Sequence, residues 1–180
     1  MIETERLILR EWRDADRDIF LKTCNTSAVT RFLGGQSTDE QLDAAIARIR
    51  ACQAANGHCF WAIERRNDRS FLGYCGLKIA NRVCPAIEGE IEIGWRLSED
   101  AWGQGYAREA AETTLAWAWA NLDAPRIVAM TVPANTASWG LMERLGMTRH
   151  ADLDFAHPVF AADHPLSAHI VYAIDRPHPR

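Results

Sequence analysis

The sequence lacks any long, uninterrupted apolar segment. Its first residues, MIETERLILREW, carry charges at positions 3, 5, 6, 10 and 11, which leaves no room for the apolar stretch of a secretory signal. The longest helical stretch with little charge, 110–122, contains Glu112 and is too short to span a bilayer. We therefore expect a cytoplasmic protein with no membrane partner.

The cysteine spacing of a metal-binding or disulfide-bonded domain is also missing. The five cysteines are odd in number and include no Cys-x-x-Cys pair. Neither a structural zinc site nor a disulfide framework is expected, and buried, reduced thiols are the favoured interpretation. We expect no metal.

No strong excess of charge of one sign is present. The net charge is −4 and charged residues make up 24% of the chain, so we expect no direct nucleic-acid partner. Internal repeats, low-complexity segments and linker-like runs are absent as well. A length of 180 residues therefore indicates one domain that spans 1–180.

Several common catalytic and nucleotide-binding motifs are missing. The glycine pair in Gly103-Gln104-Gly105 is too closely spaced for the phosphate loop of nucleotide hydrolases. Arg108 occupies the third glycine position of the dinucleotide-binding fingerprint, which excludes that motif. The sequence contains neither Gly-x-Ser-x-Gly nor His-Glu-x-x-His, so the corresponding hydrolases are not favoured.

Strand and helix patterns instead alternate along the chain in the order β-α-α-β-β-β-α-β-α-β-β. The strands on either side of the third helix form a βαβ unit and should be parallel, whereas the remaining consecutive strands favour antiparallel pairing. This pattern predicts a mixed sheet in an α/β or α+β domain. The predicted strands are 6–12, 59–65, 71–79, 88–97, 126–132, 147–155 and 168–175, and the helices are one capped by Asp14, then 39–55, 105–122 and 135–145.

The segment SEDAWGQGYAREA, residues 98–110, predicts an anion site between a strand and a helix. The first N–H groups of a helix lack intrahelical partners, and the helix dipole adds positive charge there. Gly103 and Gly105 would let a phosphate approach the backbone, with Ala107 as the next smallest choice. A tight turn in which the glycines serve only geometry explains the loop equally well.

A second motif, VPANTASWGLMERLGM at 132–147, places Ser138 three residues after Asn135 and ends its helix at Gly146. The two motifs together resemble the Gcn5-related N-acetyltransferase family. TERLILREWRDADRDIF and EIEIGWRLSEDAWGQGYAREA extend the resemblance, over nearly the whole chain, to the branch that includes the ribosomal-protein N-terminal acetyltransferases. Two residues depart from the family pattern. Trp102 replaces a Gln or Arg in the loop, and Met142 replaces a frequent tyrosine general acid.

The resemblance implies a mixed, mostly antiparallel sheet with a central parallel β-α-β coenzyme A groove and helices on both faces. It also implies direct acetyl transfer from acetyl-CoA to a primary amine in a ternary complex. Strand backbone past Gly94 would pair with the pantetheine arm, the N–H near Trp95 would polarise the thioester carbonyl, and the loop would hold the pyrophosphate. The implied coenzyme-binding residues are Gly94, Trp95, Arg96, Leu97, Trp102, Gly103, Gln104, Gly105, Tyr106, Ala107, Asn135 and Ser138.

Acetyl transfer to an amine requires two proton transfers. Ser138 is the candidate acid, because a thiol titrates near about 8.5 and a weak acid suffices to protonate the leaving thiolate. A small packed residue, or one hydrogen-bonded to the helix backbone, would explain Ser138 as well. Glu92 is the candidate base, although a solvated strand face would account equally for Glu90 and Glu92.

The acceptor pocket should be built from the first helices and the last hairpin, with Trp12, Arg31, Phe32 and Glu92 as candidate walls. The histidine-containing segment 154–169 is interpreted as a loop that caps this pocket or packs on the surface, and less readily as a metal cluster. The favoured acceptor is a protein or peptide N-terminal α-amine. A small amine (polyamine, amino acid or antibiotic) and a non-catalytic acyl-CoA-binding module are the alternatives. Monomer and homodimer are both expected possibilities.

Overall fold

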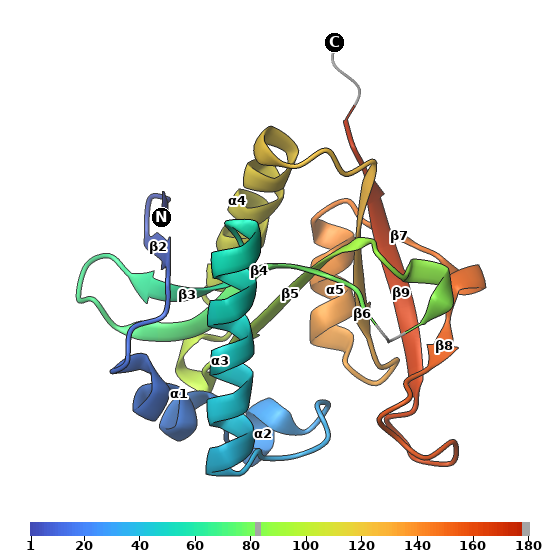
Figure 1. Ribbon diagram of the computed structural model, residues 1–180, viewed down its shortest axis with the longest axis horizontal. Helices are drawn as coiled ribbons and strands as arrows, with labels where there is room; N and C mark the ends of the chain where they lie inside the picture. The colour runs from blue at the N-terminus through green and yellow to red at the C-terminus, as the bar shows by residue number, and fades with distance from the viewer. Residues whose placement is uncertain (82–83, 178–180) are drawn as a thin grey trace.

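The computed structural model describes residues 1–81 and 84–177, and one mixed sheet forms its centre (Figure 1). The strands run in the order β1-β2-β3-β4-β5-β6-β9-β7, with β8 paired to β9. Every pair in the described residues is antiparallel except β5–β6, which is parallel as the βαβ pattern predicts. The strands are β1 (Ile2–Glu3), β2 (Leu7–Arg10), β3 (Phe60–Arg65), β4 (Phe71–Ile79), β5 (Ile91–Leu97), β6 (Arg126–Thr131), β7 (Thr148–Arg149), β8 (Phe155–Ala156) and β9 (Ala168–Asp175).

Strands β5 and β6 separate after a short parallel ladder. They pair at Ile91 with Ile127 and at Glu92 with Val128. Beyond Glu92, β5 remains paired with β4 and β6 remains paired with β9. The two halves of the sheet therefore diverge, and the edges of β5 and β6 that face each other lose their strand partner (Figure 1).

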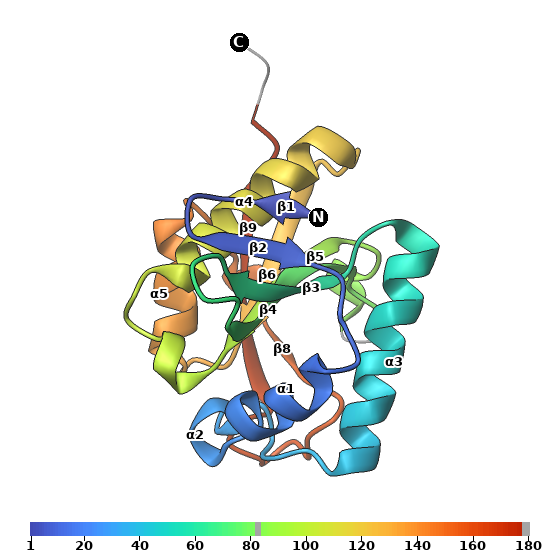
Figure 2. The same cartoon turned by 90° about the vertical axis from the view of Figure 1, so that its left-hand side faces the viewer.

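Helices cover both faces of the sheet, as predicted (Figure 2). On one face α4 and α5 join a single apolar cluster, to which Ala110 and Met142 belong. On the opposite face α1 and α3 pack through Phe20 and Leu42. No helix in the described ranges is long and apolar enough to cross a bilayer. The helices are α1 (Asp16–Cys24), α2 (Ser27–Thr30), α3 (Asp39–Asn56), α4 (Tyr106–Asn121) and α5 (Thr136–Arg144).

Helix α1 begins at Asp16, one residue later than a cap at Asp14 would place it. The residue before the helix is Ala15, and no side chain caps it. Asp14 instead accepts a hydrogen bond from Arg50 on α3 at 2.7 Å, while the Asp16 carboxylate points inward to Arg10. The predicted cap is wrong because both carboxylates bind arginines rather than the free N–H groups of the helix.

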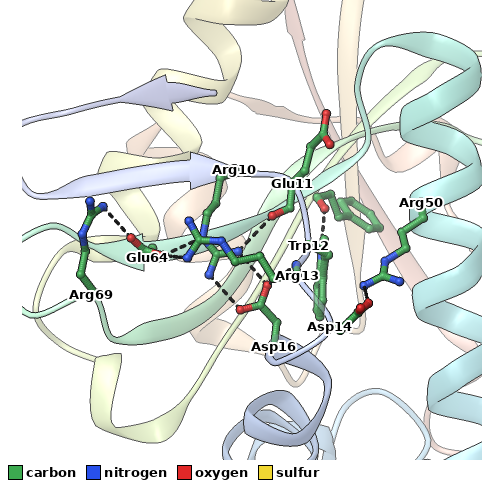
Figure 3. A network of polar contacts seen from close by, with 10 residues as sticks. Arg10, Glu11, Trp12, Arg13, Asp14, Asp16, Arg50, Glu64 and Arg69 are labelled. Carbon is green, nitrogen blue, oxygen red and sulfur yellow. Dashed lines mark hydrogen bonds and ion pairs between the residues drawn. The ribbon is translucent and has the colours of Figure 1, made fainter.

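A buried polar network ties the start of α1 to β2 and β3 (Figure 3). Arg10 lies between Asp16 and Glu64, with its Nε 2.7 Å from Glu64 Oε2. Arg13 and Arg69 also reach the Glu64 carboxylate, at 2.8 and 2.7 Å. Burial by itself would raise the pKa of Glu64, but the three guanidinium groups outweigh it and hold that pKa below its ordinary value.

The single strand predicted over 147–155 is wrong. Two short strands, β7 and β8, flank a 3₁₀ turn at Ala151–Leu153. The His150 N–H donates to the Val171 carbonyl at 2.9 Å, and the Val171 N–H donates to Asp154 Oδ1 at 3.3 Å. These bonds keep the turn beside β9 while they interrupt the regular ladder.

Other predicted bounds differ less. Strands β4 and β9 begin and end at the predicted residues, and α3 extends one residue further than predicted, to Asn56. Strand β5 begins at Ile91 rather than 88, because Gly89 adopts a φ of +82° in the tight turn that precedes it. The sequence did not predict β1 or α2. Along α4, Ala111 and Leu115 are buried, whereas Ala107, Trp119 and Leu122, which follows the helix, are only partly buried.

Candidate active site

A cavity of about 660 Å³ lies where the N-terminal ends of α4 and α5 meet the segment around α2. It brings together most of the residues that the sequence singles out. The predicted site residues that line it are Arg31, Phe32, Trp95, Arg96, Leu97, Trp102, Gly103, Gly105, Ala107, Asn135 and Ser138. The predicted site residues outside its lining are Trp12, Glu92, Gly94, Gln104 and Tyr106.

The loop before α4 has an open backbone. Gly103 and Gly105 have φ angles of +71° and +80°, in the left-handed region that glycine favours. A Cβ added to Gly103 would meet no heavy atom within 4 Å. The Glu109 N–H bonds to the Gly105 carbonyl at 3.0 Å, so the N–H groups nearer the helix start lack an intrahelical acceptor. This end of α4 therefore has the geometry and partial positive charge that an anion requires.

Gln104 and Tyr106, at the end of this loop, do not line the cavity, and their side chains contact the rest of the protein. The side-chain amide of Gln104 donates to the Asp100 carbonyl, and the backbone carbonyl of Gln104 accepts from Arg6 Nη1 at 3.0 Å. The Arg6 guanidinium also lies 4.7 Å from the centre of the Tyr106 ring. Gln104 and Tyr106 can therefore offer only their backbone to a ligand. Trp102 is half exposed, and its indole N–H donates to the Leu97 carbonyl at 3.0 Å.

The diverging strands frame the cavity. On one side it is lined by Trp95, Arg96 and Leu97 of β5, and on the other by Asn135 just beyond β6. The Arg96 guanidinium donates twice to the Cys24 carbonyl, at 2.9 and 2.6 Å, and lies over the Phe20 ring. Its side chain thus holds α1 against the sheet, which leaves the β5 backbone edge as the part available to a ligand.

Helix α5 places Ser138 on the cavity wall and Met142 in the core. The Asn135 amide donates to Thr131 Oγ1 at 3.1 Å, so it anchors the helix start to the end of β6. Ser138 is half-buried and lines the cavity. Met142, which stands where the family often has tyrosine, is 1% exposed and packs in the main apolar cluster.

Glu92 lies where β5 and β6 separate, and it faces the α1–α3 side of the sheet. It is the last residue of β5 that pairs with β6, and it is only 8% exposed. Lys78, its cross-strand partner on β4, has Nζ 3.1 Å from Glu92 Oε2. Burial raises the pKa of Glu92 above its ordinary value, and the charge of Lys78 opposes part of that rise.

The candidate acceptor-side residues fall into two places. Arg31 and Phe32 line the main cavity, with the guanidinium 4.4 Å from the ring centre. Trp12 instead lines a second cavity of about 420 Å³, together with Phe60, and its indole N–H donates to the Phe60 carbonyl at 2.8 Å. The ring of Trp12 packs edge-on against Phe20, so the structure separates it from Arg31 and Phe32.

The histidine-containing segment forms a cluster of rings. The ring centres of His157 and His169 lie 4.8 Å apart, and the Phe160 ring stacks on the His164 ring with 4.9 Å between their centres. A Cβ on Gly34 would lie 3.1 Å from the Phe160 ring, so this cluster contacts the loop after α2. No group of three metal-binding side chains occurs within residues 1–81 and 84–177.

Three basic residues near the site are not among the site residues that the sequence predicts. Arg108 and Arg144 line the main cavity, and Lys78 pairs with Glu92. Arg144 could have been found, because on a helix it shares a face with Leu141, which follows Ser138 by three residues. The Lys78–Glu92 contact depends on the register between two strands and has no local sequence signal.

Comparison with known proteins agrees with this geometry. The family model described as "Acetyltransferase (GNAT) domain" matches residues 6–148. An uncharacterized N-acetyltransferase of Bacillus subtilis, YoaA, is 26% identical over 155 residues, which cover 85% of each chain. An acetyltransferase structure from Agrobacterium tumefaciens is 26% identical with a TM-score of 0.77 and covers 96% of this chain and 92% of the other.

Two further structures are more distant in sequence and show only the shared fold. Spermidine N-acetyltransferase from Vibrio cholerae, solved with CoA and spermine, has a TM-score of 0.73 at 15% identity, over 96% of this chain and 97% of the other. Ribosomal-protein-S5-alanine acetyltransferase from Vibrio fischeri has a TM-score of 0.69 at 18% identity, over 97% and 95%. The family model matches most of the chain, and the Agrobacterium tumefaciens acetyltransferase shares its fold: the protein belongs to the GNAT family of acetyltransferases.

Proposed function

We propose that the protein is an acetyl-CoA-dependent N-acetyltransferase that acts on a protein or peptide N-terminal α-amine. The observation that carries this proposal is the continuity of one cavity from the open loop before α4 to the separated edges of β5 and β6. A long donor with a diphosphate at one end and a thioester at the other fits such a cavity. The membership in the GNAT family supports the same reaction.

The backbone would provide most of the donor site. The N–H groups from Gly103 to Ala107 would hold the diphosphate, and the free edge of β5 from Gly94 to Leu97 would pair with the pantetheine arm. Asn135 would bind the arm near the sulfur. Arg108 and Arg144 add positive charge to the same cavity, and no carboxylate occurs among its described lining residues.

The chemistry would run by direct attack in a ternary complex. The acceptor nitrogen forms a bond to the thioester carbonyl carbon, the carbon–sulfur bond breaks, and the N–H near Trp95 stabilises the charge on the carbonyl oxygen. The acceptor proton passes to Glu92, directly or through one water, and Ser138 supplies a proton to the leaving thiolate. Glu92 then releases its proton to solvent and Ser138 takes one up from solvent, so both side chains return to their starting forms. The burial that raises the pKa of Glu92 brings it closer to the pKa of an amine.

The charge of the cavity favours an α-amine over a polyamine. Its described lining includes Arg31, Arg96, Arg108 and Arg144 and offers no carboxylate to a second ammonium group. A peptide α-amine titrates near about 7.7–8.0, so roughly a fifth is neutral at pH 7.4, whereas a lysine side chain is neutral about one time in a thousand at that pH. A single buried carboxylate is therefore an adequate base for an α-amine.

Release of CoA thiol from acetyl-CoA tests the proposal directly. The panel contains a short peptide with a free N-terminus, the same peptide blocked at its N-terminus but carrying one lysine, and spermidine. We expect turnover with the free peptide alone. Turnover with spermidine but not with the peptide would favour a small-amine enzyme. If calorimetry shows that acetyl-CoA binds but no acceptor is acetylated, the protein would be a non-catalytic acyl-CoA-binding module. The presence of Met142 in place of the family's frequent tyrosine is the reason to test this alternative.

A further inference from the structure

Lys78 and Glu92 form a cross-strand pair at the fork of the sheet, by which we mean the point beyond Glu92 and Val128 where β5 and β6 separate. They lie directly opposite each other on β4 and β5, with Nζ 3.1 Å from Oε2. Glu92 Oε2 is buried and has no hydrogen-bond partner of good geometry in the described residues, so Lys78 supplies its nearest compensating charge. A buried carboxylate without such a charge takes up a proton rather than remain ionised.

Among the residues that the structure describes, Lys78 is the one cation whose charge acts on Glu92. On β4, Tyr74 is half-buried and stacks on Phe60, whose ring centre lies 5.9 Å from Lys78 Nζ. The strand β6 contributes Val128, an apolar residue, opposite Glu92. The other titratable neighbours are the Cys59 thiol and His157, whose electrostatic interactions are with Lys78.

Position and chemistry together assign a role to this lysine. We propose that Lys78 is a positioning residue of the transferase: its ammonium fixes the Glu92 carboxylate at the fork and keeps it ionised, ready to accept the acceptor proton. This inference rests on the proposed function, because it requires Glu92 to be the base. Lys78 itself does not reach the reacting atoms and acts through Glu92.

The effect on pH dependence has a defined sign. Burial raises the pKa of Glu92, and Lys78 lowers it. A base works only when deprotonated, so activity falls as the pH drops through its pKa. Removal of the Lys78 charge should raise that pKa further, and the acidic limb of the pH–rate profile should move to higher pH.

The test compares kcat/KM against pH for the wild type, Lys78→Met, Lys78→Arg and Glu92→Gln. We expect the acidic limb of Lys78→Met to move up by about one pH unit, equivalent to a roughly tenfold loss of kcat/KM on that limb. Lys78→Arg should restore the wild-type position, and Glu92→Gln should remove the limb. Lys22→Met is the matched control, since Lys22 is exposed and is the only other lysine in the sequence.

Each result has one meaning. An acidic limb that disappears in Glu92→Gln but stays in place in Lys78→Met overturns the role of Lys78 and leaves the proposed function intact. A wild-type profile without an acidic limb, or one that survives in Glu92→Gln, overturns Glu92 as the base. If Lys78→Met does not fold, Lys78→Gln removes the same charge while it keeps a polar side chain, and the same shift is expected.

Discussion

Arg10 and Asp16 form a bidentate ion pair inside the protein, with Nη1 2.7 Å from Oδ2 and Nη2 2.8 Å from Oδ1. Both residues are almost fully buried, and Arg10 also reaches Glu64 on β3. The pair joins β2 to the first turn of α1. Since α1 leads directly into the α2 segment that lines the main cavity, this network sets the position of one cavity wall.

Loss of the Glu64 charge should destabilise the fold. Glu64→Gln leaves Arg10 buried with one partner, and we expect the free energy of unfolding at pH 7 to fall by about 3 kcal/mol. Arg13→Gln is the control, because the Arg13 side chain is 61% exposed and its pair should contribute less than about 1 kcal/mol. Urea denaturation measures the free energy of unfolding of both variants. Equal losses in the two would contradict the conclusion that the buried Glu64 contributes more to stability than the exposed Arg13.

The difference in stability between the wild type and Glu64→Gln should also depend on pH. The folded-state pKa of Glu64 is lowered, so its contribution to stability is present above the unfolded value of about 4.3 and is lost as the pH falls through the folded pKa. The stability difference between wild type and Glu64→Gln should therefore shrink in acid. A difference that stays constant down to pH 3 would show that Glu64 is not held ionised.

Donor binding should depend on the charge at Gly103 more than on its size. Gly103→Asn and Gly103→Asp have nearly the same shape, and the added Cβ meets no atom within 4 Å. Asn and Asp both tolerate a positive φ, but only Asp places a negative charge at the proposed diphosphate site. Calorimetry should give a dissociation constant for acetyl-CoA at least about tenfold weaker for Gly103→Asp than for Gly103→Asn. Equal affinities would mean that the diphosphate lies elsewhere.

Loss of the Ser138 hydroxyl should slow turnover without weakening donor binding. Ser138→Ala removes the proposed proton donor but leaves the backbone of α5 in place. We expect kcat to fall roughly tenfold or more while the dissociation constant of acetyl-CoA stays within about twofold. Thr136→Ala is the matched control, since Thr136 carries a hydroxyl on the same helix and lines the same cavity. Similar kinetics in the two variants would reduce Ser138 to a packing residue.

Four of the five cysteines should react slowly with thiol reagents. Burial raises the pKa of Cys75 and of Cys59 to about 12 and that of Cys24 to about 11, and Cys84 is buried too. At pH 8 a thiol of pKa about 11 is ionised about one time in a thousand. Cys52 is half-buried and should be modified first. Ellman's reagent measures the reaction rate of the thiols in the native protein, with the protein in guanidinium chloride as the fully reactive reference. Rapid reaction of several thiols in the native protein would contradict the prediction.

Much of the fold could be predicted because its signals are local. Short, mostly apolar runs at 71–79 and 168–175 indicate β4 and β9, and the residues that flank 39–55 include the Thr38 cap and Gly57 stop of α3. The βαβ pattern correctly predicted that β5 and β6 are parallel. The prediction failed at Asp14 and in 147–155, where contacts with residues far along the chain outweigh the local pattern.

The sequence by itself determined the order of the longer helices and strands, the glycine loop before α4 and the family, because periodicity, caps and motif spacing are properties of neighbouring residues. Only the tertiary structure decided that Lys78 faces Glu92, that Trp12 lies apart from Arg31 and Phe32, and that two further arginines line the cavity. Strand register, the fork between β5 and β6 and the packing of α1 set those relationships. A residue's own sequence neighbourhood carries no record of such long-range contacts.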